Sequence, residues 1–274
     1  MLRRSFNLVE RELAEVESAR IASSVDEYLA AMKLNLVHDG YVHRGIMTPH
    51  GAGVRMTPYL ALNSSTVFVA LESGKVEGTI SLVKDGELGL PMEKIYSEEI
   101  NALRAKGLQL AEVGALSVSL NKRGSGMAFL LNKTMLLAAL QLLDVDELVI
   151  AVHPDVADFY SGVLLFETMG PVHSYPSLGR EALAVAMRLN VKTLREAYRS
   201  RWSRLPKNAA NPYWLYFERN DRQIQLPTTP AELATLHAVH SKAAMKLVAL
   251  RPDVVLELSG VEFAAMLRAA GATS

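Results

Sequence analysis

Residues 110–143 read LAEVGALSV, SLNKRGSGM and AFLLNKTMLLAALQLL. The first segment is apolar with partial alternation, which predicts a β-strand at 110–118. The last is a long apolar run, which predicts a buried α-helix that begins near residue 128. The segment between them is short, basic and rich in glycine. A strand, a loop of this kind and a helix form a unit of α/β structure, and the rest of the chain is organised around it.

The middle segment predicts an anion-binding loop. Asn121, Gly124 and Gly126 stand in the order N-x-x-G-x-G, and Lys122 and Arg123 add positive charge. Small residues before a helix leave its first backbone N–H groups available to a phosphate or another anion. Glycines in a short loop often do no more than turn the chain, and that alternative stays open for an isolated motif.

The order of strand, glycine loop and helix resembles the pyrophosphate loop of the GCN5-related N-acyltransferases (GNATs). Their usual pattern is Gln or Arg, two residues, Gly, one residue, and then Gly or Ala; Asn121 takes the first place here. The resemblance implies that the loop and the end of the strand bind an acyl thioester donor. The implied donor-binding residues are Leu116, Ser117, Val118, Asn121, Lys122, Arg123, Gly124, Ser125 and Gly126.

The composition excludes several classes of protein. With 274 residues and 50% hydrophobic residues, the chain has ample material for a core. Lys+Arg 29 balance Asp+Glu 29, so no global field favours nucleic acid. The absence of cysteine excludes disulfides, thiolate metal sites and a cysteine nucleophile. Because the chain also lacks a signal-peptide pattern and a membrane-length apolar run, we expect a cytoplasmic protein without an integral membrane segment.

The histidines predict no metal site. His237 and His240 are spaced i, i+3 on an expected helix, but no carboxylate motif accompanies them. Surface histidines are therefore the better interpretation of this pair. The other histidines do not form a ligand pair with metal-binding spacing.

Apolar periodicity predicts the remaining elements. Because strands and helices alternate, with hairpins at both ends, the expected fold class is α/β (α+β), a GNAT-like twisted mixed β-sheet flanked by helices. We expect helices at 8–17, 25–37, 95–106 and 156–165, strands at 19–23, 66–71, 76–83, 148–152, 166–172 and 182–191, and a long loop at 42–59.

The character of the chain changes after Val191. A basic run spans residues 192–207, and two amphipathic helices are expected from Pro230, one through Leu250 and one at 261–270. We therefore divide the chain into a GNAT-like N-acyltransferase domain at 1–191 and a helical C-terminal extension at 192–274.

Two stretches carry a closer resemblance. Residues 78–118 resemble the FeeM-type N-acyl amino acid synthases, and so does LVIAVHPDVADFYSGVLLFETMG from Leu148, in which Val152, Pro154, Phe159, Tyr160, Phe166 and Gly170 fall at the family's positions. These synthases belong to the GNAT superfamily and are related to acyl-homoserine-lactone synthases. The resemblance implies transfer of a long acyl chain from an acyl carrier protein to the α-amine of an amino acid. It implies an acyl thioester as co-substrate, and neither a metal nor a redox cofactor.

This reaction needs a base, because an α-ammonium must lose a proton before its nitrogen can attack a thioester. Glu112 is the best candidate, since a carboxyl in so apolar a strand is costly without a partner. The alternative is that Glu112 points to solvent or pairs with Lys or Arg. The superfamily resemblance implies that backbone N–H groups around Leu116 to Val118 polarise the thioester carbonyl.

The same resemblance implies that Tyr160 is the acid for the departing sulfur. The alternative is a helix tyrosine that packs beside Phe159 and Phe166. In the basic run, Arg195, Arg199 and Arg204 are candidates for docking an acidic acyl carrier protein, although such a run is usually a solvated face. Two further alternatives stay open, a coenzyme A thioester donor with another amine as acceptor, and a binding module without catalytic activity.

Overall fold

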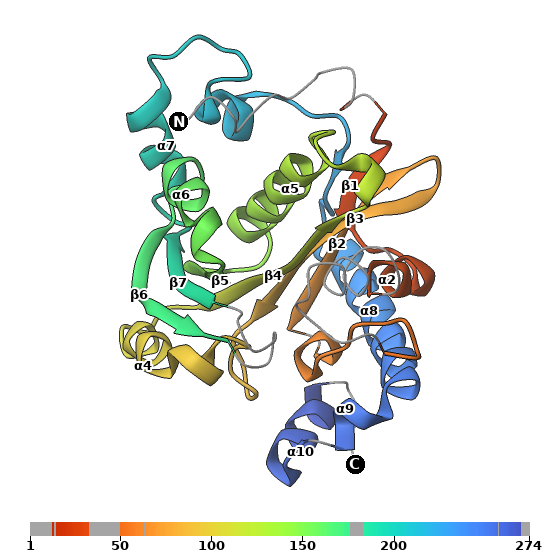
Figure 1. Ribbon diagram of the computed structural model, residues 1–274. Coiled ribbons are helices and arrows are strands. Elements are labelled where there is room, and N and C mark those ends of the chain that lie inside the picture. The colour runs from red at the N-terminus through yellow and green to blue at the C-terminus, as the bar shows by residue number, and fades with distance from the viewer. Residues whose placement is uncertain are drawn as a thin grey trace.

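The computed structural model describes residues 13, 15–32, 50–62, 64–175, 183–256 and 258–269, and these form one twisted mixed β-sheet flanked by helices (Figure 1). Its eight strands lie in the order β6-β7-β5-β4-β3-β2-β1-β8. Neighbours are antiparallel except for β4 beside β5 and β1 beside β8. The strands are β1 (Ser18–Ile21), β2 (Ser65–Glu72), β3 (Lys75–Lys84), β4 (Leu110–Val118), β5 (Glu147–Val152), β6 (Glu167–Ser174), β7 (Leu183–Asn190) and β8 (Ile224–Gln225).

The helices precede, separate and follow these strands. They are α2 (Val25–Met32), the 3-10 helix η2 (Pro58–Ala61), α4 (Glu93–Arg104), the 3-10 helix η3 (Leu120–Lys122), α5 (Met127–Gln141), α6 (Pro154–Gly162), α7 (Leu194–Trp202), the π-helix η5 (Trp214–Glu218), α8 (Pro230–Leu250), α9 (Pro252–Leu256) and α10 (Gly260–Ala269).

Most expected elements are confirmed within a few residues. The helix expected at 156–165 instead begins at Pro154, because the His153 side chain accepts a hydrogen bond from the Asp155 N–H at 3.2 Å and proline suits the first turn. Most of the helix expected at 8–17, the end of the one at 25–37 and residues 42–49 of the expected loop lie outside the described residues. The helices η2, η3, α7, η5 and α9 and the strand β8 were not predicted.

Alternate side chains of the strands enter different cores. Phe68 and Ala70 of β2 belong to the core under α5, whereas Val67 and Val69 face the core under α2 and α8. A third core lies under α4 and includes Leu110 of β4. Because successive residues of a strand point to opposite faces, α5 covers one face and the other three helices cover the opposite one.

Helix α5 lies at the centre of the first core. Its apolar side chains are buried around most of its circumference, as expected for a helix covered on several sides. It contacts β1, β2, β3 and β4, and Leu215 and Tyr216 of η5 belong to the same core. The extension after residue 191 therefore shares a core with the domain before it, although the boundary itself stays a prediction.

Candidate active site

The central strand β4 contains a β-bulge. Opposite it on β3, Thr79 pairs with Ser117 and Ser81 pairs with Gly114, so two residues of β4 face one residue of β3. Ala115 lies in the bulge with φ 51°, a left-handed conformation that is uncommon outside glycine. A bulge of this kind bends the strand and redirects the residues after it. It therefore separates the first half of β4, which carries Glu112, from the Leu116–Val118 segment.

Beside the bulge, β4 leaves its parallel neighbour. Within the described strands, the β4–β5 ladder covers Leu110–Glu112 and Glu147–Val149. Beyond it, β4 continues to Val118 and β5 to Val152. The two strand ends thus diverge from the point where Glu112 lies, and the edge of β4 between them offers backbone groups to a ligand.

The glycine loop has the conformation that its sequence predicts. Gly124 has φ 85° and Gly126 has φ 79°, which is the left-handed region that favours glycine. Gly126 caps α5, and the Ser125 Oγ accepts a hydrogen bond from the Met127 N–H at 3.4 Å. The start of this 15-residue helix therefore lies directly after the loop. Its N-terminal N–H groups carry the partial positive charge that attracts an anion.

The two cations of the loop have different surroundings. The Lys122 ammonium forms an ion pair with the Glu72 carboxylate at the β2–β3 hairpin, which raises the pKa of Lys122. Arg123, like Asn121, is exposed at the loop surface. Of the two predicted cationic contacts, Arg123 is the better placed to meet a phosphate, because the charge of Lys122 is already compensated.

Glu112 is buried, with only 8% of its surface exposed. It lies on the α4 side of the sheet, since its cross-strand neighbour Val83 belongs to that core. Its Oε2 accepts a hydrogen bond from the Met92 backbone N–H at 2.8 Å, just before α4. The alternative of a solvent-facing carboxylate is therefore wrong.

Burial raises the pKa of Glu112 to about 8. The Met92 N–H and the positive charge of Arg55 act in the opposite direction, while the negative charge of Glu93 raises the pKa further. A carboxyl with this pKa gains and loses a proton in the neutral range, as a general base must.

The segment before and in η2 contributes two residues that sequence analysis missed. Arg55 is close enough to Glu112 to influence its ionisation. Tyr59 packs against both the core under α2 and α8 and the core under α4. Burial and the charges of Glu112, Glu93 and Glu262 raise the pKa of Tyr59 to about 12. The irregular composition of residues 42–59 gives no periodicity from which these positions could be found; only the length of the loop marked it as functional.

Tyr160 lies on the other side of the sheet from Glu112. It projects from α6 onto the core under α5, and its ring makes edge-to-face contacts with Phe159 and Phe166 at centroid distances of 5.8 and 5.6 Å. The packing expected from the alternative interpretation is therefore observed. Tyr160 lies on α6, the helix that follows β5, and its role in proton transfer stays a prediction.

The predicted docking residues lie on or just after α7, which is adjacent to α6 (Figure 1). The Tyr198 hydroxyl donates to the Val163 carbonyl at 2.9 Å and fixes α7 beside the end of α6. Arg195, Arg199 and Arg204 are all exposed; Arg195 lies over the Phe217 ring, and Arg199 lies 4.0 Å from Glu196.

The expectation for His237 and His240 is wrong for His240. Its side chain is only 6% exposed because α8 packs on α2, where the imidazole meets the Tyr28 ring edge-on at 4.9 Å. Burial lowers the pKa of His240 to about 4, so it is neutral at neutral pH. Among the described residues, no group of three or more His, Cys, Asp or Glu is arranged to hold a metal ion, and no helix has the length and hydropathy of a membrane span.

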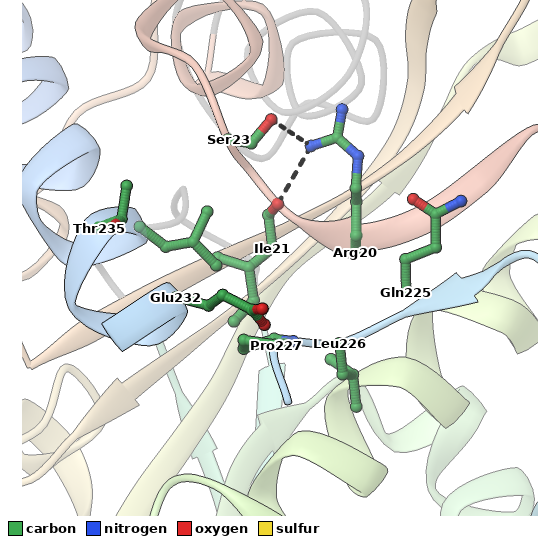
Figure 2. A pocket seen from close by; sticks show the side chains of 9 residues that line it. Arg20, Ile21, Ser23, Gln225, Leu226, Pro227, Glu232 and Thr235 are labelled. Atoms are coloured by element: carbon green, nitrogen blue, oxygen red, sulfur yellow. Dashed lines mark hydrogen bonds between the residues drawn. The ribbon is translucent and has the colours of Figure 1, made fainter. Parts of the chain in front are cut away.

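A cavity of about 340 Å³ lies away from these residues, between β1, β8 and the start of α8. Figure 2 shows Arg20 at its edge, with the guanidinium donating to the Ser23 hydroxyl and the Ile21 carbonyl. Arg20 also binds the Glu27 carboxylate, and the Glu232 carboxylate accepts a hydrogen bond from the Thr228 N–H just before α8. Because β2 and β3 separate β1 from β4 and these charged groups already have partners, we do not assign the cavity to the reaction.

Solved structures of other proteins resemble this chain. The FeeM structure, an N-acyl amino acid synthase from uncultured soil microbes, shares 31% identity over 65% of this chain and 92% of its own, with a TM-score of 0.56. BjaI, a CoA-dependent acyl-homoserine lactone synthase, shares 14% identity over 80% of this chain and 98% of its own, with a TM-score of 0.50, and supports the fold alone.

An acetyltransferase of the GNAT family from Streptococcus pneumoniae shares 11% identity over 63% of this chain and 97% of its own, with a TM-score of 0.44. The comparison with curated proteins found no match. The family described as N-acyl amino acid synthase FeeM matches residues 33–190, which is more than half of the chain. The expected twisted mixed sheet flanked by helices is confirmed. The chain belongs to the N-acyl amino acid synthase FeeM family and is an N-acyltransferase.

Proposed function

We propose that this N-acyltransferase works in the cytoplasm and transfers a long-chain acyl group from the thioester of an acyl carrier protein to the α-amine of an amino acid. The observation that carries the proposal is Glu112, a buried carboxyl at the point where β4 leaves β5, with a pKa raised to about 8. Such a group suits a general base, because it can take a proton from an ammonium group and release it again.

In this proposal the phosphopantetheine arm of the donor lies along the edge of β4, between the diverging strands. Its phosphate meets the N–H groups that begin α5 and the Arg123 guanidinium. The thioester carbonyl accepts hydrogen bonds from backbone N–H groups of the Leu116–Val118 segment, which begins in the bulge. These bonds polarise the carbonyl and stabilise the oxyanion that forms when it is attacked.

Glu112 takes one proton from the acceptor ammonium, directly or through water, and the nitrogen attacks the thioester carbon. The carbon–sulfur bond then breaks, and Tyr160 donates its phenolic proton to the leaving thiolate. The second nitrogen proton passes to the Tyr160 phenolate, and Glu112 releases its proton to solvent. The products are an amide and the free thiol of the donor.

An amino acid acceptor is supported by the charges around Glu112. Arg55 contributes a positive charge that favours the ionised form of Glu112. A cation beside the base also suits an acceptor that carries a carboxylate next to its amine. The pairing of Arg55 with that carboxylate would orient the amine toward Glu112.

A carrier-protein donor is supported by the exposed arginines of α7, since acyl carrier proteins are strongly acidic and dock electrostatically. An acyl-CoA donor is the second candidate. The same glycine loop suits the pyrophosphate of coenzyme A, and BjaI, which has a similar fold, is described as CoA-dependent.

Mass spectrometry of lipid extracts from cells that express the protein tests the proposal. We expect a new N-acyl amino acid that is absent from cells expressing Glu112→Gln. Accumulation of an N-acylated amine without a carboxylate would contradict the acceptor. Purified protein supplied with either acyl carrier protein or acyl-CoA then distinguishes the donors.

A further inference from the structure

Arg104, the last residue of α4, connects two carboxylates, and the charge of one of them, Glu93, acts on the proposed base. Its Nε and Nη2 each donate to an oxygen of Asp85 at 2.7 Å, and its Nη1 donates to the Glu93 Oε2 at 2.8 Å. Asp85 follows β3, and its backbone N–H donates to the Leu110 carbonyl at 2.9 Å, at the start of β4. Glu93 is the first residue of α4. One guanidinium therefore ties the beginning of α4 to the strand that carries Glu112.

The first turn of α4 depends on this tie because the helix is interrupted after it. Tyr96 has φ −127° and ψ 39°, which are not helical values, so the kink separates the first turn from the rest of α4. The Glu93 Oε1 accepts a hydrogen bond from the Leu90 N–H at 2.5 Å. The Met92 N–H, directly before this turn, donates to Glu112 at 2.8 Å. The position of Glu93 therefore controls where the Met92 N–H points.

Arg104 also balances charge. Among the described residues, the charged or titratable groups that face Glu112 are Glu93 from α4, Arg55 from the segment before η2 and Tyr59 in η2. The paired strands present Val83 and Val149 to it. Glu93 disfavours the ionised form of Glu112. A cation bound to Glu93 reduces that effect, because opposite charges at hydrogen-bond distance largely cancel at a third site.

We propose that Arg104 is a positioning residue for acyl transfer: by binding Glu93 it keeps the Met92 N–H on Glu112 and balances the negative charge beside the base. The inference rests on the proposed function for the role of Glu112. It predicts that Arg104 and Glu93 change the ionisation of Glu112 in opposite directions, which a merely structural role in α4 would not do.

The pH profile of kcat/KM in wild type and five variants tests this inference. Arg104→Met should move the acid limb to higher pH by roughly 0.5 to 1 unit, and Glu93→Gln should move it to lower pH by a similar amount. The double variant should return toward wild type, and Arg104→Lys should restore most of the profile. Lys106→Met, which removes an exposed cation just after the same helix, is the matched control and should leave the limb in place.

Carboxyl-carbon NMR of protein labelled at glutamate gives a second readout that does not depend on activity, with the Glu112 signal assigned by its loss in Glu112→Gln. Shifts of the Glu112 titration in the same direction for both single variants, or no shift, would overturn the inference. The Glu93→Gln variant keeps the Arg104–Asp85 pair, so the inference stays testable if Arg104→Met fails to fold. If the two single variants shift the Glu112 titration in opposite directions but Glu112→Gln keeps full activity, the role of Glu112 as general base is refuted. The effect of Arg104 and Glu93 on the ionisation of Glu112 is then still supported.

Discussion

At the scale of single residues, Glu112 is buried beside α4, where its carboxyl accepts a backbone hydrogen bond. A carboxyl in an apolar strand is unusual enough to be noticed, because burying it without a partner is costly. Its partner is the backbone N–H of Met92, 20 residues earlier in the chain, and a backbone group has no signature in a sequence. Arg55 and Tyr59 were missed for a related reason, since they lie in an irregular segment that only the fold brings to β4.

The first prediction concerns the stability of Glu112→Gln as a function of pH. Below the ordinary pKa of 4.5, the carboxyl is neutral in both the folded and the unfolded chain. Between 4.5 and about 8, the unfolded chain ionises while the folded chain retains the proton, so wild-type stability falls as pH rises. Glutamine does not ionise. The free energy of unfolding of Glu112→Gln, relative to that of wild type, should therefore increase by about 1.4 kcal/mol for each pH unit in this window.

Urea denaturation at several pH values measures this difference. A constant difference from pH 5 to pH 8 would mean that the pKa of Glu112 is not raised in the folded protein.

The second prediction concerns Tyr160→Phe. The variant keeps the ring that packs between Phe159 and Phe166 and loses only the hydroxyl. If the hydroxyl protonates the departing thiolate, the rate of acyl transfer should fall by about ten- to a thousand-fold with little change in melting temperature. Single-turnover kinetics and thermal melts measure the two effects. A lower melting temperature with an unchanged rate would make Tyr160 a packing residue only.

At the scale of elements, periodicity and glycine placement predicted the central unit well. The strand, the loop with Gly124 and Gly126 and the helix α5 are all observed, because positive φ and a long apolar run leave direct marks on a sequence. The bulge at Ala115 leaves no mark, since alanine is an ordinary strand residue. The ion pair of Lys122 with Glu72 was not predictable either, because it joins the loop to a hairpin fifty residues away.

The third prediction concerns the contact between β3 and α5. A Cβ atom on Gly78 would lie 2.9 Å from both the Met127 Sδ and the Leu131 Cδ1, and both of these side chains are fully buried. Gly78→Ala should therefore destabilise the protein by about 1–3 kcal/mol, as overpacking a tight core does. Because Met127 begins α5, the KM for the acyl donor should rise as well.

Gly86→Ala is the control, because a Cβ atom there meets nothing within 4 Å. Equal urea midpoints for the two alanine variants would show that β3 and α5 are not in close contact.

At the scale of the whole molecule, the sequence indicated where the character of the chain changes but not how its parts are joined. The Lys133 ammonium on α5 is buried and donates to the Leu215 and Arg219 carbonyls and to the Asp221 carboxylate, at 2.7, 2.6 and 2.7 Å. Residues before and after 191 thus share a buried ion pair. Contacts between residues so far apart in sequence depend on tertiary structure, which local patterns do not encode.

The fourth prediction concerns the docking surface. Reversal of charge at Arg195, Arg199 and Arg204 should slow association with an acyl carrier protein by about ten-fold at low salt, and added salt should remove much of the difference. Transfer from acyl-CoA should be unchanged. Reversal at Arg123 should instead impair both donors. Stopped-flow binding measures the association rates, and an unaltered rate for the triple variant at low salt would place the docking surface elsewhere.

The pH dependence of acyl transfer by wild type and Glu112→Gln tests the central claim most directly. If Glu112 is the base, wild-type kcat/KM should rise with pH through an apparent pKa of about 8. The variant should lose that limb, keep only the titration of the acceptor amine, and be slower by about ten- to ten-thousand-fold. A variant with wild-type rates and the same limb would contradict the account.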